Sequence, residues 1–94
     1  MMIDNELTNT KARVNIKTSR QLQEYAFELG FIWQDQPKGV RHNSKPFLYF
    51  KPNGVINYGV NKDTFEEHSE LEIKTEEFIK ARIFEGAYLE QIIC

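Results

Sequence analysis

The fold is decided by residues 12–33, which read ARVNIKTSRQLQEYAFELGFIW. The first six of these residues alternate apolar and polar side chains, as a half-buried β-strand does, so we predict a strand over 12–17. Thr18 and Gln21 then have the spacing of a capping box, in which each residue satisfies a backbone amide of the other. This spacing predicts that a helix begins at Thr18.

The predicted helix carries a single apolar stripe. Four residues repeat at the i, i+3, i+4, i+7 spacing of one helix face: Leu22, Tyr25, Ala26 and Leu29. Gly30 follows where a left-handed helix end favours glycine, and residues 31–33 (FIW) predict a short strand. The stretch therefore predicts a strand–helix–strand unit that serves as the scaffold.

Residues 34–46 are rich in turn-forming side chains and predict an exposed loop. The apolar segments 47–51 and 55–59 flank Pro52-Asn53-Gly54, which is a typical hairpin turn. We expect the inward face of this hairpin to hold Leu48, Phe50, either Val55 or Ile56, and Tyr58.

The last third predicts helix. Residues 61–68 predict a helical turn that is capped by Asp63 or Thr64 and anchored by Phe65. Residues 71–73 could add a strand. Thr75 then caps the last helix. Apolar residues cover most of the circumference of that last helix, which favours a partner or oligomer interface at its end. The alternative is that this helix wraps around the core of its own domain. The candidate interface residues are Phe84, Tyr88, Leu89 and Ile92.

These elements predict an α+β fold. We expect a small, mainly antiparallel sheet in the order β-α-β-β-β-α, with one helix packed on it and a C-terminal helix. A chain of 94 residues is the size of one domain. We assign that domain to residues 12–94, with residues 1–11 as a flexible N-terminal arm and residues 80–94 as a helical extension.

Composition limits where the protein works. No apolar run approaches the roughly 20 residues that cross a bilayer, and the N-terminus does not resemble a signal peptide. The single cysteine, Cys94, rules out an internal disulfide. We therefore expect a cytoplasmic protein that makes no membrane contact.

Charge is distributed unevenly along the chain. Residues 35–60 carry four bases and one acid, a balance of +3, whereas residues 61–94 carry four bases and nine acids, a balance of −5. The bases gather in a predicted loop and its neighbouring strand, and they make a candidate partner-binding surface. Its residues are Lys38, Arg41, His42, Lys45 and Lys51.

Patterns for catalysis are missing from the sequence. The two histidines, His42 and His68, have no second histidine or cysteine at a metal-ligand spacing, and the acidic residues from Glu66 to Glu77 follow no calcium-loop pattern. We therefore expect no enzyme activity, no metal and no cofactor. Bases beside Trp33, Phe47, Tyr49 and Tyr58 could serve single-stranded nucleic acid, but these aromatics read more economically as core, and the net charge of −2 opposes binding.

Several packing motifs resemble small uncharacterised proteins of tailed bacteriophages. They are Val14-x-Ile16, Ala26-Phe27-x-Leu29-Gly30-Phe31-x-Trp33, Pro46-Phe47-Leu48-Tyr49, Tyr58-Gly59, Phe65-x-x-His68 and Glu72-Ile73-x-x-Glu76-Glu77-Phe78. The resemblance covers residues 12 to 79 and speaks for fold and origin. It implies an early or accessory protein that binds a host protein, but it assigns no functional residue.

The expected function is a non-enzymatic phage protein that inhibits or redirects a host protein, such as a defence factor of the restriction or CRISPR type, in the host cytoplasm. The basic loop would contact the partner, and the C-terminal helix would contact the partner or a second copy of the chain. The alternative is a nucleic-acid-binding accessory protein that uses the basic loop 38–51.

Overall fold

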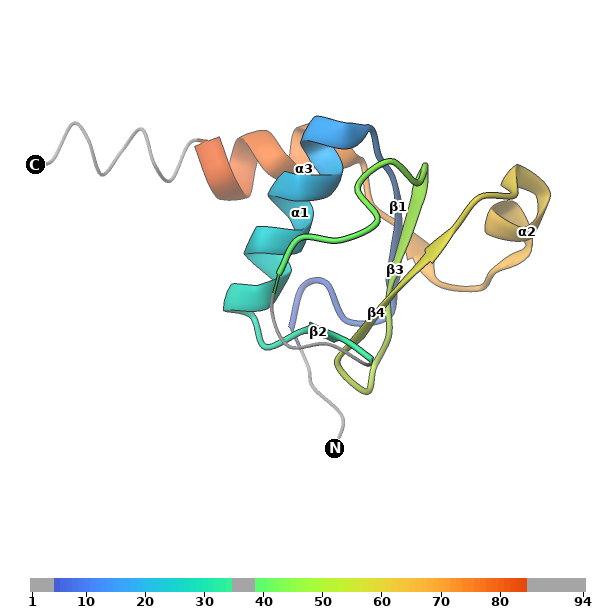
Figure 1. Ribbon diagram of the computed structural model, residues 1–94, viewed down its shortest axis with the longest axis horizontal. Coiled ribbons are helices and arrows are strands. Elements are labelled where there is room, and N and C mark those ends of the chain that lie inside the picture. The colour runs from blue at the N-terminus through green and yellow to red at the C-terminus, as the bar shows by residue number, and fades with distance from the viewer. Residues whose placement is uncertain (1–4, 35–38, 85–94) are drawn as a thin grey trace, which may run out of the picture.

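The structure is a computed structural model that describes residues 5–34 and 39–84. Its elements follow in the order β1 (Thr10–Arg13), α1 (Ile16–Glu28), β2 (Ile32–Trp33), β3 (Phe47–Phe50), β4 (Val55–Gly59), α2 (Lys62–Glu67), β5 (Leu71–Glu72), α3 (Thr75–Ile79) and a π-helical turn, η1 (Lys80–Phe84) (Figure 1).

The described strands form one five-stranded sheet in the order β2-β4-β3-β1-β5. The central strand β3 is antiparallel to both of its neighbours, β4 and β1, whereas β2 runs parallel to β4 and β5 runs parallel to β1. The α+β class is confirmed. The expected mainly antiparallel sheet is wrong, because both edge strands are parallel additions and the sheet is mixed.

The expected order β-α-β-β-β-α also differs from the observed one, which has an additional helix and strand before α3. Strand β5 is only two residues long, too short to give a periodic signal. Backbone bonds to the β1 segment hold it in place, from Leu71 N to Asn9 O (3.2 Å) and from Ile73 N to Lys11 O (2.9 Å). Long-range pairing, not local sequence, makes this strand.

Helix α1 begins at Ile16, so the predicted start at Thr18 is wrong. Asn15 is the N-cap: its side-chain oxygen accepts the Thr18 amide at 2.8 Å, and the Thr18 hydroxyl accepts the Asn15 amide at 2.8 Å. The capping box thus lies three residues earlier in the chain, with Thr18 as its second partner. At the other end, Gly30 has φ +99°, as predicted for a glycine that ends a helix.

The N-terminal boundary also differs. The predicted flexible arm over residues 1–11 is wrong for Leu7 to Lys11, because Leu7 is completely buried and Thr10 and Lys11 belong to β1. Strand β1 starts early because Thr10 pairs with Phe50 on the core face, and it ends at Arg13 because the cap of α1 follows. Residues 1–4 lie outside the described part.

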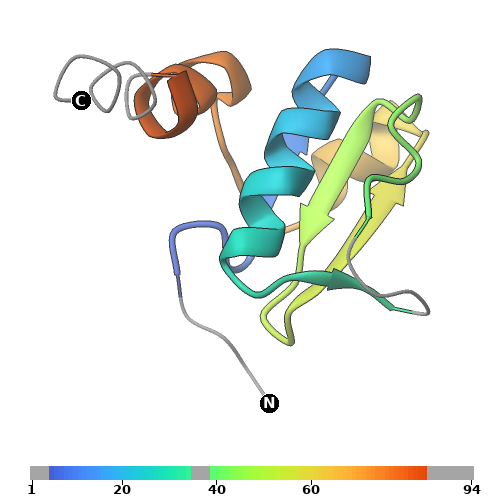
Figure 2. The same ribbon diagram turned by 60° about the vertical axis from the view of Figure 1, so that its left-hand side comes forward.

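The two faces of the sheet are covered by different helices. Helix α1 packs on one face, and α3 lies on the far side of α1 from β3 and β4 (Figure 2). Helix α2 packs on the opposite face, where Phe65 contacts Phe47 and Tyr49. Strand β3 is therefore buried on both faces, as a strand between two layers must be.

The main core confirms the predicted α1 stripe. Leu22 and Ala26 are completely buried, and Tyr25 and Leu29 pack against them. The buried residues of this cluster are Leu7, Ala12, Leu22, Ala26, Phe27, Phe31, Trp33, Leu48, Phe50, Ile56 and Ile79.

The predicted hairpin is confirmed, with Gly54 at φ +85° in its turn. Leu48, Phe50 and Ile56 fill the core as expected. Tyr58 does not, because 43% of its surface is exposed. It pairs with Leu48 and points to the same face, where it stacks on His42 near the end of β4.

The helices of the C-terminal third differ from expectation in their caps. Asn61 caps α2, in place of Asp63 or Thr64, by accepting the Thr64 amide at 3.0 Å. Lys74 precedes α3 without a side-chain cap, and Thr75 instead donates its hydroxyl to Arg13 O at 2.7 Å, which ties α3 to β1.

The beginning of the last helix is core. Ile79 is buried, and Phe78 meets Tyr25 edge-to-face, with 5.7 Å between ring centroids. The proposed interface lies further along. The side chain of Phe84 and the whole of Tyr88, Leu89 and Ile92 fall outside the described residues.

Candidate functional site

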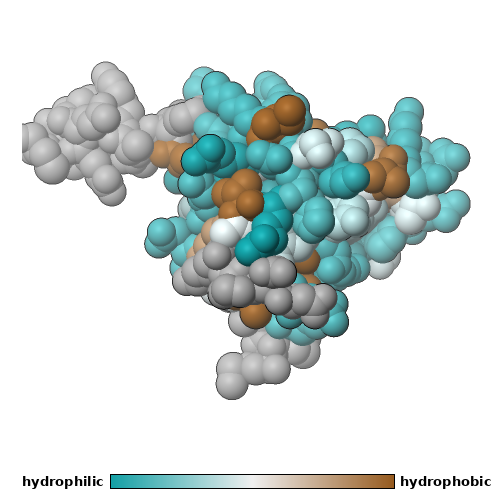
Figure 3. Space-filling view, in the orientation of Figure 1, coloured by the Kyte–Doolittle hydropathy of each residue, from teal (hydrophilic) through white to brown (hydrophobic). Residues whose placement is uncertain are grey.

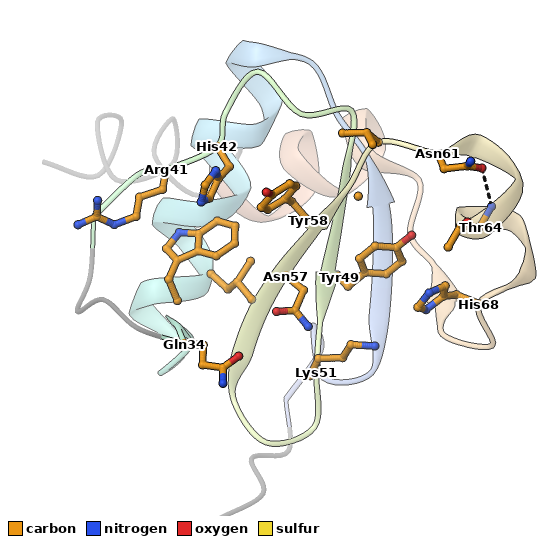
Figure 4. A pocket seen from close by; sticks show the side chains of 14 residues that line it. Gln34, Arg41, His42, Tyr49, Lys51, Asn57, Tyr58, Asn61, Thr64 and His68 are labelled. Atoms are coloured by element: carbon orange, nitrogen blue, oxygen red, sulfur yellow. Dashed lines mark hydrogen bonds between the residues drawn. The ribbon is translucent and has the colours of Figure 1, made fainter.

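An open hollow runs along the second half of β4, with a volume of about 540 Å³. Six consecutive residues, 56–61, form its floor; the loop at Arg41 and His42 forms one wall, and the first turn of α2 forms the other (Figure 4). We call this feature the β4 hollow. Its lining residues are Trp33, Gln34, Arg41, His42, Tyr49, Lys51, Ile56, Asn57, Tyr58, Gly59, Val60, Asn61, Thr64 and His68.

The hollow exists because β2 is shorter than β4. Strand β2 covers only Val55 and Ile56 of β4, whereas β4 continues to Gly59. Past Ile56, β4 has β3 on one side and no strand among the described residues on the other. Side chains from both faces of β4 reach the hollow because the exposed edge itself lies at its centre.

One wall is aromatic. The His42 ring stacks on Tyr58, with 4.4 Å between centroids and 27° between planes, and it meets Trp33 edge-to-face at 5.1 Å. The Lys45 ammonium lies 5.6 Å from the centre of the Tyr58 ring, within the range of a cation–π contact. These contacts leave a flat, partly exposed aromatic surface beside two basic residues, Arg41 and Lys45.

Gln23 of α1 positions this wall. Its side chain is completely buried and accepts hydrogen bonds from Trp33 Nε1 (3.1 Å) and the Arg41 amide (2.8 Å). It donates to the Arg41 carbonyl (2.7 Å) and to Ser19 Oγ (3.0 Å). Both amide protons and both lone-pair directions of Gln23 are thus used, and residue 41 is held at both of its backbone groups.

His42 adopts φ +52°, a backbone conformation that non-glycine residues seldom take. The preceding residue, Arg41, is bonded to Gln23, and the His42 ring is held between Trp33 and Tyr58. These contacts hold His42 in a backbone conformation that it would seldom adopt alone. Such conformations are common where a side chain must point in a defined direction.

The other wall depends on α2, whose buried residue is Phe65. The Phe65 ring stacks on Phe47 at 4.4 Å, and the Lys11 ammonium lies 4.5 Å from its centre. Lys11 is buried and donates to the carbonyls of Phe65 and His68, where the end of α2 leaves carbonyl groups free. These contacts hold Asn61, Thr64 and His68 at the hollow.

A charged cluster closes the lower end of the hollow. The Glu70 carboxylate accepts hydrogen bonds from Lys51 Nζ and faces His68 Nδ1 at 3.1 Å, and the His68 ring lies 4.5 Å from that of Tyr49. Burial by itself would raise the pKa of Glu70, but bonds from Lys51, from its own backbone amide and from His68 together lower that pKa. Glu70 is therefore an ionised acceptor that orients two basic side chains.

Glu70→Gln should reduce stability in a pH-dependent way. Because folding lowers the pKa of Glu70, its contribution is complete above the unfolded-state pKa, about 4.3 for glutamate, and is lost as pH falls through the folded-state value. We expect wild type to exceed the variant in free energy of unfolding by about 2 kcal/mol at pH 7. Urea denaturation at a series of pH values measures this difference, which should shrink below pH 4; a constant difference would contradict the assignment.

Two buried polar atoms at the hollow have no hydrogen-bond partner among the described residues: Tyr49 Oη and Arg41 Nε. Tyr49 is only 4% exposed, and its hydroxyl lies against Gly59, where an added Cβ would come within 3.1 Å of it. Burial, followed by the nearby Glu70 charge, raises the pKa of Tyr49, so the hydroxyl keeps its proton. Both atoms are donors that could serve an acceptor in the hollow.

The described residues that line the hollow include no aspartate or glutamate. Arg41 and Lys45 form no ion pair among the described residues, whereas Arg13 is paired with Glu66 and Glu72 and Arg82 with Glu6. Glu70 borders the hollow through Lys51 and His68, so the positive charge that stays unpaired within the described part of the chain lies at Arg41 and Lys45. Such a surface suits a ligand rich in acceptors or negative charge.

Four of the five predicted partner-binding residues gather at this site. Arg41, His42 and Lys51 line the hollow, and Lys45 borders it through Tyr58. Lys38 falls outside the described residues. The structure adds residues that sequence reasoning missed, with Gln23 as the support of the wall and Asn57 and His68 as lining, and it exposes Tyr58, which was expected in the core.

The sequence offered one signal for the role of Gln23, which is its position between the apolar stripe residues of α1. Many surface glutamines share that pattern. The exposure of Tyr58 had no local signal at all. It results from the length of β2, which no pattern in β4 encodes.

The surface and the composition of the described residues also bear on metal binding and on membrane insertion. The face seen in Figure 3 is mainly hydrophilic, with hydrophobic residues in separate small patches. Among the described residues there is no group of three or more histidine, cysteine, aspartate or glutamate side chains that could hold a metal ion. None of the helices described is long and apolar enough to cross a membrane.

Comparison with known proteins finds no matching family model, no similar curated protein and no similar solved structure. The contacts within the chain therefore carry the functional argument.

Proposed function

We propose that this chain is a non-enzymatic binding protein that recognises an acidic segment of a partner protein through the β4 hollow. The observation that carries this proposal is that the described lining includes no acid and that Arg41 and Lys45 form no ion pair with any other described residue. A binding surface gains specificity when its charges find complementary charges on the partner. The neighbouring aromatic wall supplies the rigid contact area that such interfaces favour.

The resemblance to small phage proteins supports a bacterial host protein as this partner, with a defence factor as one candidate, and the proposal includes action in the host cytoplasm. A self-association through the C-terminal helix remains part of the proposal, but it concerns residues outside those described. Neither point changes the chemistry expected at the hollow.

Single-stranded nucleic acid is the second candidate. The stacked rings of His42 and Tyr58 favour it, because exposed aromatic faces beside basic residues bind splayed bases and their phosphates. Negative charge elsewhere opposes it, since residues 61–94 carry a balance of −5. We favour the protein partner because a short acidic segment needs only local positive charge.

Removing the two charges that form no ion pair among the described residues should weaken partner binding. We expect the variant Arg41→Gln with Lys45→Gln to lose about tenfold or more in affinity, because both charges face the partner. The matched control is Lys74→Gln with Lys80→Gln, which removes the same net charge from exposed residues around α3. The measurement is affinity capture from a bacterial lysate with quantitative mass spectrometry.

A partner captured equally by all three proteins would contradict the role of the hollow, and the absence of any specific partner would contradict the function. The nucleic-acid candidate is tested separately by fluorescence anisotropy with a labelled single-stranded oligonucleotide. It requires an affinity that falls steeply with salt and that drops in the hollow variant but not in the control.

A further inference from the structure

We propose that the acidic partner segment binds in extended form, as an additional strand on the exposed edge of β4. This inference rests on the proposed function and specifies how the partner is held. Extended peptides commonly bind in this way, with backbone bonds providing affinity and alternate side chains providing selectivity. Three features of β4 support strand addition: the direction of its backbone groups, the length of its open edge and the chemistry of the side chains around that edge.

The backbone direction follows from bonds at the start of β4. Lys51 N donates to Val55 O at 3.0 Å, so the polar groups of Val55 face β3, whereas Ile32 N donates to Gly54 O on the β2 side at 2.9 Å. Because backbone groups alternate along a strand, Asn57 and Gly59 face β3, and Tyr58 faces the opposite edge. Ile56 also faces that edge, but β2 covers it.

Tyr58 therefore directs its amide and carbonyl into the hollow. Among the described residues, no backbone hydrogen bond from a loop reaches either group. The open edge runs from Asn57 to Val60, which is roughly 13 Å at about 3.3 Å per residue and enough for a short strand. A bound peptide would continue the line of β2 along β4.

The two edges of the sheet differ in protection. Proteins usually block an exposed strand edge with charges, proline or a very short strand. Strand β5, at the other edge, is two residues long, contains Glu72 and is flanked by Glu70 and Lys74. The open part of β4 carries neither charge nor proline from Asn57 to Val60. This difference marks the β4 edge as the one that accepts a strand.

Side chains on both sides of this edge favour an acidic occupant. An added strand would present alternate residues to the wall of Arg41, His42 and Tyr58 and to the opposite group of Tyr49, Lys51 and His68 (Figure 4). The buried Tyr49 hydroxyl, which lacks a partner among the described residues, offers a donor to this second group. Glutamate or aspartate on the peptide would therefore meet positive charge at the Arg41 wall, whereas the second group offers donors beside Lys51, which is already paired with Glu70.

The test is amide hydrogen exchange followed by NMR on the full ¹⁵N-labelled chain. The probe is an acetylated and amidated eight-residue peptide in which valine and glutamate alternate, and the control peptide has lysine in place of every glutamate. We expect the acidic peptide at millimolar concentration to slow exchange of the Tyr58 amide about tenfold when about nine in ten molecules are bound. The neighbouring amides of Asn57 and Gly59, already bonded to β3, should change much less.

Each outcome bears on a different statement. Resonance shifts at the hollow without slower exchange at Tyr58 would overturn strand addition while leaving an acidic partner in place. No shift with the acidic peptide would overturn both the inference and the proposed function. Protection of Tyr58 that rises with protein concentration in the absence of peptide would identify a second copy of the chain as the occupant. Equal binding of the lysine peptide would overturn the acidic chemistry.

The variant Arg41→Gln with Lys45→Gln distinguishes binding through side-chain charge from binding through the β4 backbone. It should weaken binding of the acidic peptide but, once saturated, show the same protection of Tyr58. If saturation of this variant left Tyr58 unprotected, the two side chains rather than the strand edge would hold the peptide, and the inference would fail.

Discussion

Gln23→Leu should lower the free energy of unfolding by about 3 kcal/mol or more, because leucine fills the same space but leaves buried polar groups without partners. The groups concerned are Trp33 Nε1 and the amide and carbonyl of Arg41. Typical domains are stable by about 5–15 kcal/mol, so this loss is a large fraction of the total. Urea denaturation measured by Trp33 fluorescence gives the free energy directly.

The matched control is Ser19→Ala, which removes one bond to Gln23 and leaves the rest. We expect it to cost about 1 kcal/mol. The leucine variant should also weaken partner binding, since the aromatic wall would lose its support. A loss below about 1 kcal/mol for Gln23→Leu would show that water replaces the missing bonds, and that Gln23 does not position the loop.

Local sequence signals were enough for the scaffold. The α1 stripe, Gly30 at the helix end and the hairpin turn at Gly54 each depend on neighbouring residues, and each appears as expected. The error in the start of α1 arose because two neighbouring cap signals compete. Asn15 and Thr18 are both good caps, and the reciprocal bonds between them place the helix start at the first.

The mixed sheet could not be predicted in the same way. The parallel pairings of β2 and β5 join strands of two residues each to partners far along the chain. Such pairing is decided by packing of the whole domain, to which a two-residue pattern contributes almost nothing.

The candidate site was predictable only in part, because its bases are close in the sequence but the residues that support them are not. Basic residues cluster in the sequence between Arg41 and Lys51, and most of that cluster does lie at the hollow. The partners that give the cluster its shape come from elsewhere: Gln23 from α1, and His68 from the end of α2. Their contribution depends on tertiary contacts, so only the structure reveals it.

Phe65→Ala should cost about 3–5 kcal/mol, the range for removing a large aromatic side chain from a core. Phe65 is completely buried, stacks on Phe47 and lies beneath the Lys11 ammonium. A six-residue helix is too short to be stable alone, so α2 depends on this anchor for its position. We therefore expect α2 to detach from the sheet in the variant.

Detachment of α2 would have a functional consequence that distinguishes it from general loss of stability. Asn61, Thr64 and His68 would leave the hollow, while the Gln23 network and the opposite wall would remain. Hydrogen exchange should then accelerate at the His68 amide, which bonds to Thr64 O, while amides in β3 stay protected. Phe65→Leu, which retains most of the apolar volume, should cost less than about 1.5 kcal/mol and keep α2 in place. If Phe65→Ala instead accelerated exchange equally in β3 and α2, the helix would be an inseparable part of the core, and the wall it forms could not be removed without unfolding the protein.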